Sequence, residues 1–255
     1  MALAQPAAPV RNPYSKLPNW LYPTFVVGVL SLFVVFATWA VFFQPAGYFG
    51  PYLSPFDSPL ITLGPIPPAI WVAWAPLAFR LTCYYYRKAY FRSFLWHPRS
   101  CAVAESHRAS YRGETAFPWI FNNFHRFAFY ATFVQVLFLA YDAIIAFNFA
   151  GHFGVGLGSV LMLVNVGLLS AYTFGCHALR HLAGGNLDCF SCSTAASARF
   201  HLWRGITVLN IRHDRWAWAS LASVAATDGK GSYSTSISSA ASAAWCLVSA
   251  TTKAT

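Results

Sequence analysis

Charge is scarce in this chain of 255 residues: only 9% of them are Asp, Glu, Lys or Arg, whereas 57% are hydrophobic and 18% are aromatic. Soluble globular domains carry about 25% charged residues, so this composition excludes an ordinary soluble domain. Ten Trp and thirteen Tyr residues fit the aromatic belts of a bilayer interface, where each ring is half in lipid and half in water. The sequence therefore predicts an integral membrane protein.

Acidic side chains are the scarcer charge, with seven Asp and Glu against seventeen Lys and Arg, for a net charge of +10. A basic balance can indicate nucleic-acid binding. Here, however, thirteen of the seventeen basic residues fall within residues 80–126 and 180–215. Basic residues gathered in loops on one side of a membrane fix the orientation of the chain. We therefore expect both stretches to lie in the cytoplasm, with no nucleic-acid partner.

Sequence features of a cleavable signal peptide are also scarce: the first apolar run begins only at Leu21, after a Pro-rich arm that contains Arg11 and Lys16, so we expect no cleavable signal. Without a secreted context, six cysteines do not indicate a disulfide framework. Five of them are expected to face the reducing cytoplasm, where thiols stay free for metals or chemistry: Cys83, Cys101, Cys176, Cys189 and Cys192. Metal ligands are the better interpretation of these cysteines.

The apolar runs predict an all-α fold, an integral membrane bundle of five transmembrane helices, because about 20 apolar residues cross the hydrocarbon core. The spans are expected at residues 21–43, 69–86, 119–149, 155–182 and 215–249. Residues 1–20 form a cytoplasmic arm and residues 250–255 a tail. The N-terminus and the connections 87–118 and 183–214 are placed in the cytoplasm, and the connections 44–68 and 150–154 outside.

The fifth span is the least regular, because a polar stretch from Asp228 to Gly231 interrupts it. The apolar part before this stretch has about 13 residues, or about 20 Å of helix, which is too short to cross alone. The Ser- and Ala-rich remainder either completes a poorly hydrophobic span, with small residues packed against other helices, or is not natively ordered. We favour the first alternative.

Cysteines and histidines gather at the expected cytoplasmic ends of spans two and four. Cys83 and Cys101 fit the thiolate half of an iron–sulfur site, and two histidines would complete a Cys2His2 set on a 2Fe-2S cluster. The candidate imidazoles are His107, His177 and His181, with Cys176 as a reserve thiolate. The alternatives are a buried apolar role for Cys83 and, for His177 and His181, an interfacial position in contact with lipid phosphates or a partner.

His177 and His181 are four residues apart, so on one helix they project from the same face and can reach one metal. The spacing of Cys101 and His107 argues instead for a mixed contribution from the loop. The sequence does not decide between the two sets.

A quinone pocket is predicted where His125 and Arg126 open the third span, since a quinone needs a proton donor, a cation near its carbonyl and an apolar slot. Arg80 and Tyr84, at the end of the second span, are assigned to the same pocket. The alternative for the His–Arg pair is an anchor for lipid headgroups.

Three histidines among basic residues are interpreted as surface groups: His97, His201 and His213. Cys189-x-x-Cys192 has the form of half a zinc or redox motif, without a second half.

Two other functions compete with the iron–sulfur site. Bis-histidine haem b needs ligands well inside different spans, whereas these histidines cluster at the helix ends beside cysteines. A transporter needs ionisable residues at mid-span and often internal repeats. Asp142 is the only deep acidic candidate and the sequence shows no repeat, so transport is disfavoured.

Several motifs within residues 70–215 resemble those of a known family: TCYYYRKAYFRSF, CAVAESH, YRGETAFP, NNFHRF and CHALRHLAGG. This family is the membrane-anchor subunit of succinate dehydrogenase (complex II) in its actinobacterial, haem-free form with one five-helix anchor. The resemblance implies a Rieske-type 2Fe-2S cluster held by Cys and His in the membrane, and menaquinone as the electron acceptor.

The resemblance also implies partners and location. A flavoprotein subunit and an iron–sulfur subunit are expected on the cytoplasmic face of the cell inner (plasma) membrane, with succinate oxidised in those subunits and not in this chain. Membrane lipid and quinone are further partners, and a higher oligomer is left open.

Overall fold

The structure, a computed structural model, describes residues 18, 20–44, 48–49, 51–94, 117, 119–149, 151–185 and 187–228. Most of the expected N-terminal arm, most of the 95–118 connection and everything after Asp228 lie outside the described residues. Cys101 and His107 therefore lie outside them too. The described α-helices are α1 (Leu21–Phe43), α2 (Pro68–Thr82), α3 (Tyr84–Phe94), α4 (His125–Ile145), α5 (Leu157–Phe174), α6 (His177–Gly184), α7 (Thr194–Asn210) and α8 (His213–Thr227).

Three of these described helices, α1, α4 and α5, are long and apolar enough to cross a bilayer. α1 coincides with the first predicted span and contains no charged residue. Its large apolar side chains, such as Leu32, Val35 and Phe43, are more than two-thirds exposed. Such a surface is unfavourable in water but suits lipid. α2 and α8 have 15 residues each, or about 22 Å of helix, which is shorter than the hydrocarbon core.

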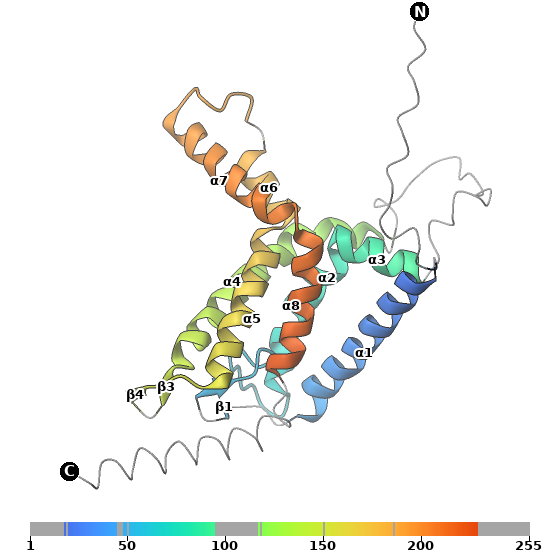
Figure 1. Cartoon of the computed structure of the whole chain (residues 1–255), viewed down its shortest axis with the longest axis vertical. Helices are drawn as coiled ribbons and strands as arrows, with labels where there is room; N and C mark the ends of the chain where they lie inside the picture. The colour runs from blue at the N-terminus through green and yellow to red at the C-terminus, as the bar shows by residue number, and fades with distance from the viewer. Residues whose placement is uncertain are drawn as a thin grey trace, which may run out of the picture.

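The predicted second span, 69–86, is divided into two helices at Cys83. α2 begins with Pro68 at its first turn, where the missing N–H is harmless, and ends at Thr82. Cys83 itself has extended backbone (ψ 126°), and α3 then starts in a new direction across the end of the bundle (Figure 1). α3 carries three basic residues in eleven, too many for a helix in lipid.

The predicted fourth span, 155–182, is likewise not one helix. α5 ends at Phe174, Cys176 is extended (ψ 141°), and α6 begins at His177. A Cβ atom at Gly175 would lie 2.7 Å from the carbonyl oxygen of Ala171 and 3.3 Å from Leu209 of α7, so glycine permits this close approach. Asn210 of α7 stabilises the break by donating a hydrogen bond to the Gly175 carbonyl at 2.8 Å.

α6 and α7 form a helical hairpin that projects from the same end of the bundle as α3 (Figure 1). Arg199 of α7 joins the two helices, because its guanidinium donates to backbone carbonyls in the last turn of α6 and just beyond it, those of Leu182, Ala183 and Gly185. The last carbonyls of a helix have no partner within the helix, so this contact satisfies them.

The opposite end carries two short β-hairpins, which the all-α prediction did not include: β1 (Tyr48–Phe49) with β2 (Tyr52–Leu53), and β3 (Asn148–Phe149) with β4 (His152–Phe153). Gly151 takes positive φ (91°) at the second turn. A 3₁₀-helix, η2 (Trp119–Phe124), precedes α4, so the predicted third span comprises η2, α4 and β3.

Buried serines connect this end to two helices. Ser58 donates to the carboxylate of Asp142 near the end of α4, and Ser54 donates to that of Asp228 after α8. Asp142 therefore lies near one end of its helix and not at mid-span.

Candidate functional site

Four helix ends meet in the main core, which lies at the end of the bundle near α3 and α6. Cys83 follows α2, His125 begins α4, Cys176 follows α5 and His213 begins α8. Both breaks in the predicted spans, at Cys83 and at Cys176, thus occur at residues of this cluster. We call the four side chains the Cys–His cluster.

The two thiols of the cluster are free and buried, with exposed fractions of 3% for Cys83 and 1% for Cys176. The Cys83 sulfur lies 3.6 Å from Nε2 of His213, and the Cys176 sulfur lies 3.1 Å from Nε2 of His125. Burial raises the pKa of the Cys176 thiol to about 12, although the backbone N–H of Ala178 donates to the sulfur and opposes this shift. A bound metal would deprotonate such a thiol outright.

Thr82 fixes the orientation of the His125 ring. Its hydroxyl donates to the Ala78 carbonyl at 2.7 Å and lies 2.9 Å from Nδ1 of His125. Because the hydroxyl proton is already used, the oxygen accepts from Nδ1–H, which leaves the lone pair on Nε2, the nitrogen beside Cys176. The ring also stacks on Phe79, with centroids 4.7 Å apart and planes 5° apart. His125 is therefore positioned as an Nε2 donor.

His213 is not a surface group, which corrects the interpretation from the sequence. Its ring stacks on Tyr172, with centroids 4.8 Å apart, and Nδ1 is buried without a hydrogen-bond partner among the described residues. The interpretation as a surface group was based on the charged residues next to His213 in the sequence. Helical spacing could have indicated burial, because His213 shares a face of α8 with the buried Ala217 and Leu221.

Arg80 adds a positive charge beside the cluster. Its guanidinium donates to Ser220 at 2.9 Å and to the Ala217 carbonyl at 3.3 Å, and it also contacts the Tyr86 hydroxyl. The guanidinium carbon lies 4.7 Å from the ring centroid of Tyr172, the residue on which His213 stacks. Arg80 thus joins α2 to α8 next to the thiols.

Other predicted site residues are not brought into the cluster. His177 and His181 have exposed side chains, in contrast to the adjacent, buried Cys176. Arg126 and Tyr84, predicted to bind quinone together with His125, are exposed, whereas both nitrogens of His125 face other partners. The structure places His125 with the thiols and not with these two residues.

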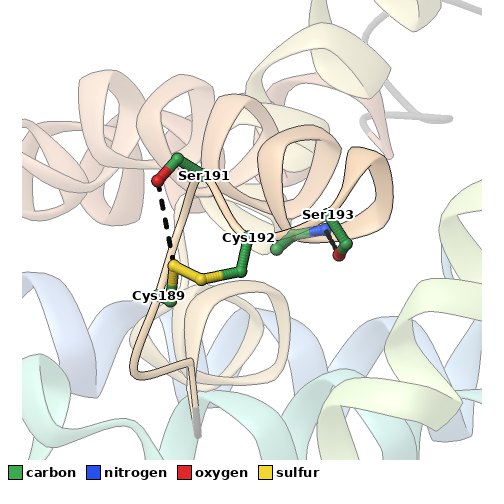
Figure 2. The surroundings of a disulfide bond; sticks show 5 residues. Cys189, Ser191, Cys192 and Ser193 are labelled. Atoms are coloured by element: carbon green, nitrogen blue, oxygen red, sulfur yellow. Dashed lines mark hydrogen bonds between the residues drawn. A yellow bond between two sulfur atoms is a disulfide. The ribbon is translucent and has the colours of Figure 1, made fainter.

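The Cys189-x-x-Cys192 pair forms a disulfide, which corrects the expectation of free thiols at these two positions. It lies in the connection between α6 and α7, beside Ser191 (Figure 2). Ser193 follows as the N-cap of α7 and accepts from the backbone N–H of Ala196 at 3.1 Å. In this state the pair offers no thiolate to a metal.

The Cys–His cluster supplies two sulfur and two nitrogen donors. Among the described residues, no three His, Cys, Asp or Glu side chains are gathered tightly enough to hold a single metal ion. The donors instead form two Cys–His contacts within an aromatic wall made by Phe79 and Tyr172. A Rieske-type 2Fe-2S group takes two Cys on one iron and two His on the other, so the number and kind of donors match this group.

Comparison with known proteins gives the family. The profile described as "Actinobacterial succinate dehydrogenase subunit SdhC" matches residues 21–239, a wider range than the motifs identified in the sequence. A solved structure, the Mycobacterium smegmatis Sdh1 complex in the apo form, contains a chain that is 38% identical and has a TM-score of 0.75, over 89% of this chain and 91% of that one. No curated protein matches. The chain therefore belongs to the actinobacterial succinate dehydrogenase SdhC family, the membrane anchors of this oxidoreductase complex.

Proposed function

We propose that this anchor passes electrons from an iron–sulfur subunit to menaquinone through a Rieske-type 2Fe-2S cluster, without haem. The observation that carries the proposal is the convergence of two buried thiols and two oriented imidazoles at one end of the bundle. The proposed ligands are Cys83, Cys176, His125 and His213. When bound by two Cys and two His, such a group carries single electrons at a higher potential than an all-Cys cluster.

The residues around the ligands fit this role. Metal-bound histidines usually donate their other N–H to a fixed partner, as Nδ1 of His125 does to Thr82. The backbone N–H of Ala178 donates to the Cys176 sulfur at 3.3 Å and would stabilise a thiolate there. Phe79 and Tyr172, each 1% exposed, keep water away from the imidazoles and hold their planes.

Haem b is the weaker alternative. Bis-histidine ligation uses imidazoles alone, whereas each imidazole of the cluster faces a thiol.

The charges of the described residues support a cytoplasmic location for the cluster. Basic residues lie at its end of the bundle, on α2, α3, α4 and α6: Arg80, Arg87, Lys88, Arg92, Arg126 and Arg180. The buried acids Asp57, Asp142 and Asp228 belong to the opposite end. Under the positive-inside rule, the end of the bundle that holds the cluster then lies on the cytoplasmic side of the cell inner membrane. In the proposed five-span topology, α2 and α8 contribute the second and fifth crossings.

Assembly with soluble subunits follows from the same orientation. The Mycobacterium smegmatis relative comes from an Sdh1 complex, which supports other succinate dehydrogenase subunits as partners of this chain. We propose that these are a flavoprotein and an iron–sulfur subunit. For quinone contact, we retain Arg80 and the exposed Arg126 and Tyr84, and we transfer His125 to the ligand set because both of its nitrogens are engaged.

Iron and acid-labile sulfide in the purified complex test the proposal. A Cys83→Ser/Cys176→Ser complex should contain two iron atoms and two sulfides fewer than the native complex. Equal contents in two equally assembled complexes would refute the ligand assignment.

Thr82→Val should lower occupancy of the cluster by about 10-fold at limiting iron, because loss of a hydrogen-bonding partner behind a ligating histidine typically weakens metal binding 10- to 100-fold. Thr82→Ser keeps the hydroxyl and is the matched control, with native iron content expected. If the Val variant binds iron as the Ser variant does, Thr82 serves only to pack α2.

Docking of the iron–sulfur subunit is predicted to involve the basic connection that begins on α3. Arg92, in the last turn of α3, is exposed, whereas Arg99 lies outside the described residues. An Arg92→Glu/Arg99→Glu chain should co-purify with less of the partner, since complementary charge guides docking, and Arg92→Gln/Arg99→Gln should have a smaller effect. Full recovery of the partner at physiological salt would show that these charges only orient the chain in the membrane.

A further inference from the structure

The connection between α6 and α7 contains a disulfide between two cysteines only three residues apart, Cys189 and Cys192. This connection lies at the end of the bundle that we place in the cytoplasm. Disulfides are rare in that reducing compartment, and those found there are usually transient and catalytic or redox-sensing. A disulfide that closes so short a loop also contributes less to stability than one that closes a long loop. Stability alone therefore does not account for this bond.

The hairpin of α6 and α7 is held together by other contacts as well. Arg199 of α7 donates to three backbone carbonyls at the end of α6, and the Arg180 guanidinium carbon lies 4.7 Å from the ring centroid of Trp203. Phe190, between the two cysteines, packs on α7, with its ring centroid 4.9 Å from that of Phe200 and 6.4 Å from that of Trp203. These contacts hold the connection against α7 when the disulfide is open, so the bond can form again.

The two sulfurs of the disulfide differ in exposure and in their neighbours. Cys192 is exposed, whereas Cys189 is half-buried. The Ser191 hydroxyl lies 3.8 Å from the Cys189 sulfur (Figure 2), and the hydroxyl is the donor because a disulfide sulfur carries no proton. A hydrogen bond of this kind becomes stronger when the sulfur is a thiolate. The geometry thus favours attack on Cys192 and departure of Cys189.

We propose that Cys189 and Cys192 form a thiol–disulfide exchange site for small cytoplasmic thiols of the glutathione type. This inference rests on the orientation given under the proposed function and not on the cluster. A reductant thiolate attacks the Cys192 sulfur, the bond to Cys189 breaks, and Cys189 leaves as a thiolate. A second reductant thiolate attacks the first reductant's sulfur and displaces Cys192, so the pair gains two electrons and two protons while the reductant becomes a disulfide. Oxidation by glutathione disulfide reverses these steps.

Thiol alkylation followed by mass spectrometry of the peptide that contains both cysteines tests the site in the assembled complex. The pair should be mostly reduced when glutathione is in about hundredfold excess over its disulfide, and mostly oxidised when the disulfide predominates, because structural disulfides resist this pool and exposed ones exchange with it. A pair that stays oxidised in both buffers is structural, and this result would overturn the inference.

The role of the Ser191 hydroxyl is tested by the rate of reduction. Ser191→Ala should react about fivefold more slowly with glutathione, since the leaving Cys189 thiolate loses a hydrogen bond. Ser197→Ala, on α7, is the matched control and should react at the native rate. If both variants react equally fast, the hydroxyl does not assist the departure of Cys189.

Single-cysteine variants distinguish the two sulfurs. After treatment with glutathione disulfide, Cys189→Ser should retain glutathione on Cys192, because no second thiol is present to displace it. Cys192→Ser should be modified at Cys189 about tenfold more slowly, since exchange depends on access to the sulfur. Equal rates would contradict the assignment of Cys192. These measurements read peptides and not electron transfer, so an exchanging pair in a complex without a membrane cluster would refute only the proposed function.

Discussion

His213→Ala is expected to reduce quinone reduction by the complex about 100-fold or more, while succinate oxidation with a soluble dye acceptor stays nearly native. The proposed ligand set loses one of four donors, and the vacated position lies in a buried site between α2 and α8. Loss of a group that supports metal binding already costs 10- to 100-fold, so loss of a ligand should cost at least as much. Paired assays on one preparation give both rates.

The control for this variant is His177→Ala/His181→Ala, which removes two exposed imidazoles near the same end of the bundle. Its quinone reductase activity should stay within about twofold of native, since both side chains are exposed and surface substitutions generally have small effects on stability. If the double variant is inactive and His213→Ala is active, the ligands are the pair in CHALRH and the assignment to α8 is wrong.

Phe79→Ala should strongly destabilise the protein. The ring is 1% exposed and packs against His125, Phe129 and Tyr172. Truncating a buried Phe to Ala typically costs about 3–5 kcal/mol, through lost contacts and the cavity left behind. At about 2–4 °C per kcal/mol for a chain of this size, the midpoint of thermal unfolding in detergent should fall by about 10 °C.

Phe127→Ala is the matched control, because its side chain is on α4 as well but is 64% exposed. Removing it should change the midpoint by no more than about 2 °C, as lipid or detergent replaces the ring. Equal shifts in the two variants would mean that the core is not at the helix ends where the Cys–His cluster lies.

The sequence predicted the membrane class and the first helix because these depend on composition and on runs of residues. The predicted first span, residues 21–43, coincides with α1, which contains no charged residue. The two breaks were missed, since nothing in an apolar run shows that Cys83 and Cys176 adopt extended backbone. That conformation is stabilised by tertiary contacts, such as Asn210 with the Gly175 carbonyl.

Of the Cys–His cluster, Cys83, Cys176 and His125 were predicted as site residues from the sequence, whereas His213 was not. A four-residue spacing puts His177 and His181 on one face of α6, but it does not say which way the face points. The break at Cys176 leaves that face exposed. His213 was missed because its position depends on packing of α8 against Tyr172, between residues far apart in the sequence. Neither Cys101 nor His107 is tested, because both lie outside the described residues.

Pulsed electron paramagnetic resonance on the reduced, intact complex tests the central claim most directly, because it detects the ligand atoms of a cluster. We predict a rhombic, Rieske-like resonance with couplings to two histidine nitrogens, and loss of that resonance from the Cys83→Ser/Cys176→Ser complex. A complex with full quinone reductase activity and no nitrogen-coupled resonance would contradict the assignment of His125 and His213 as ligands.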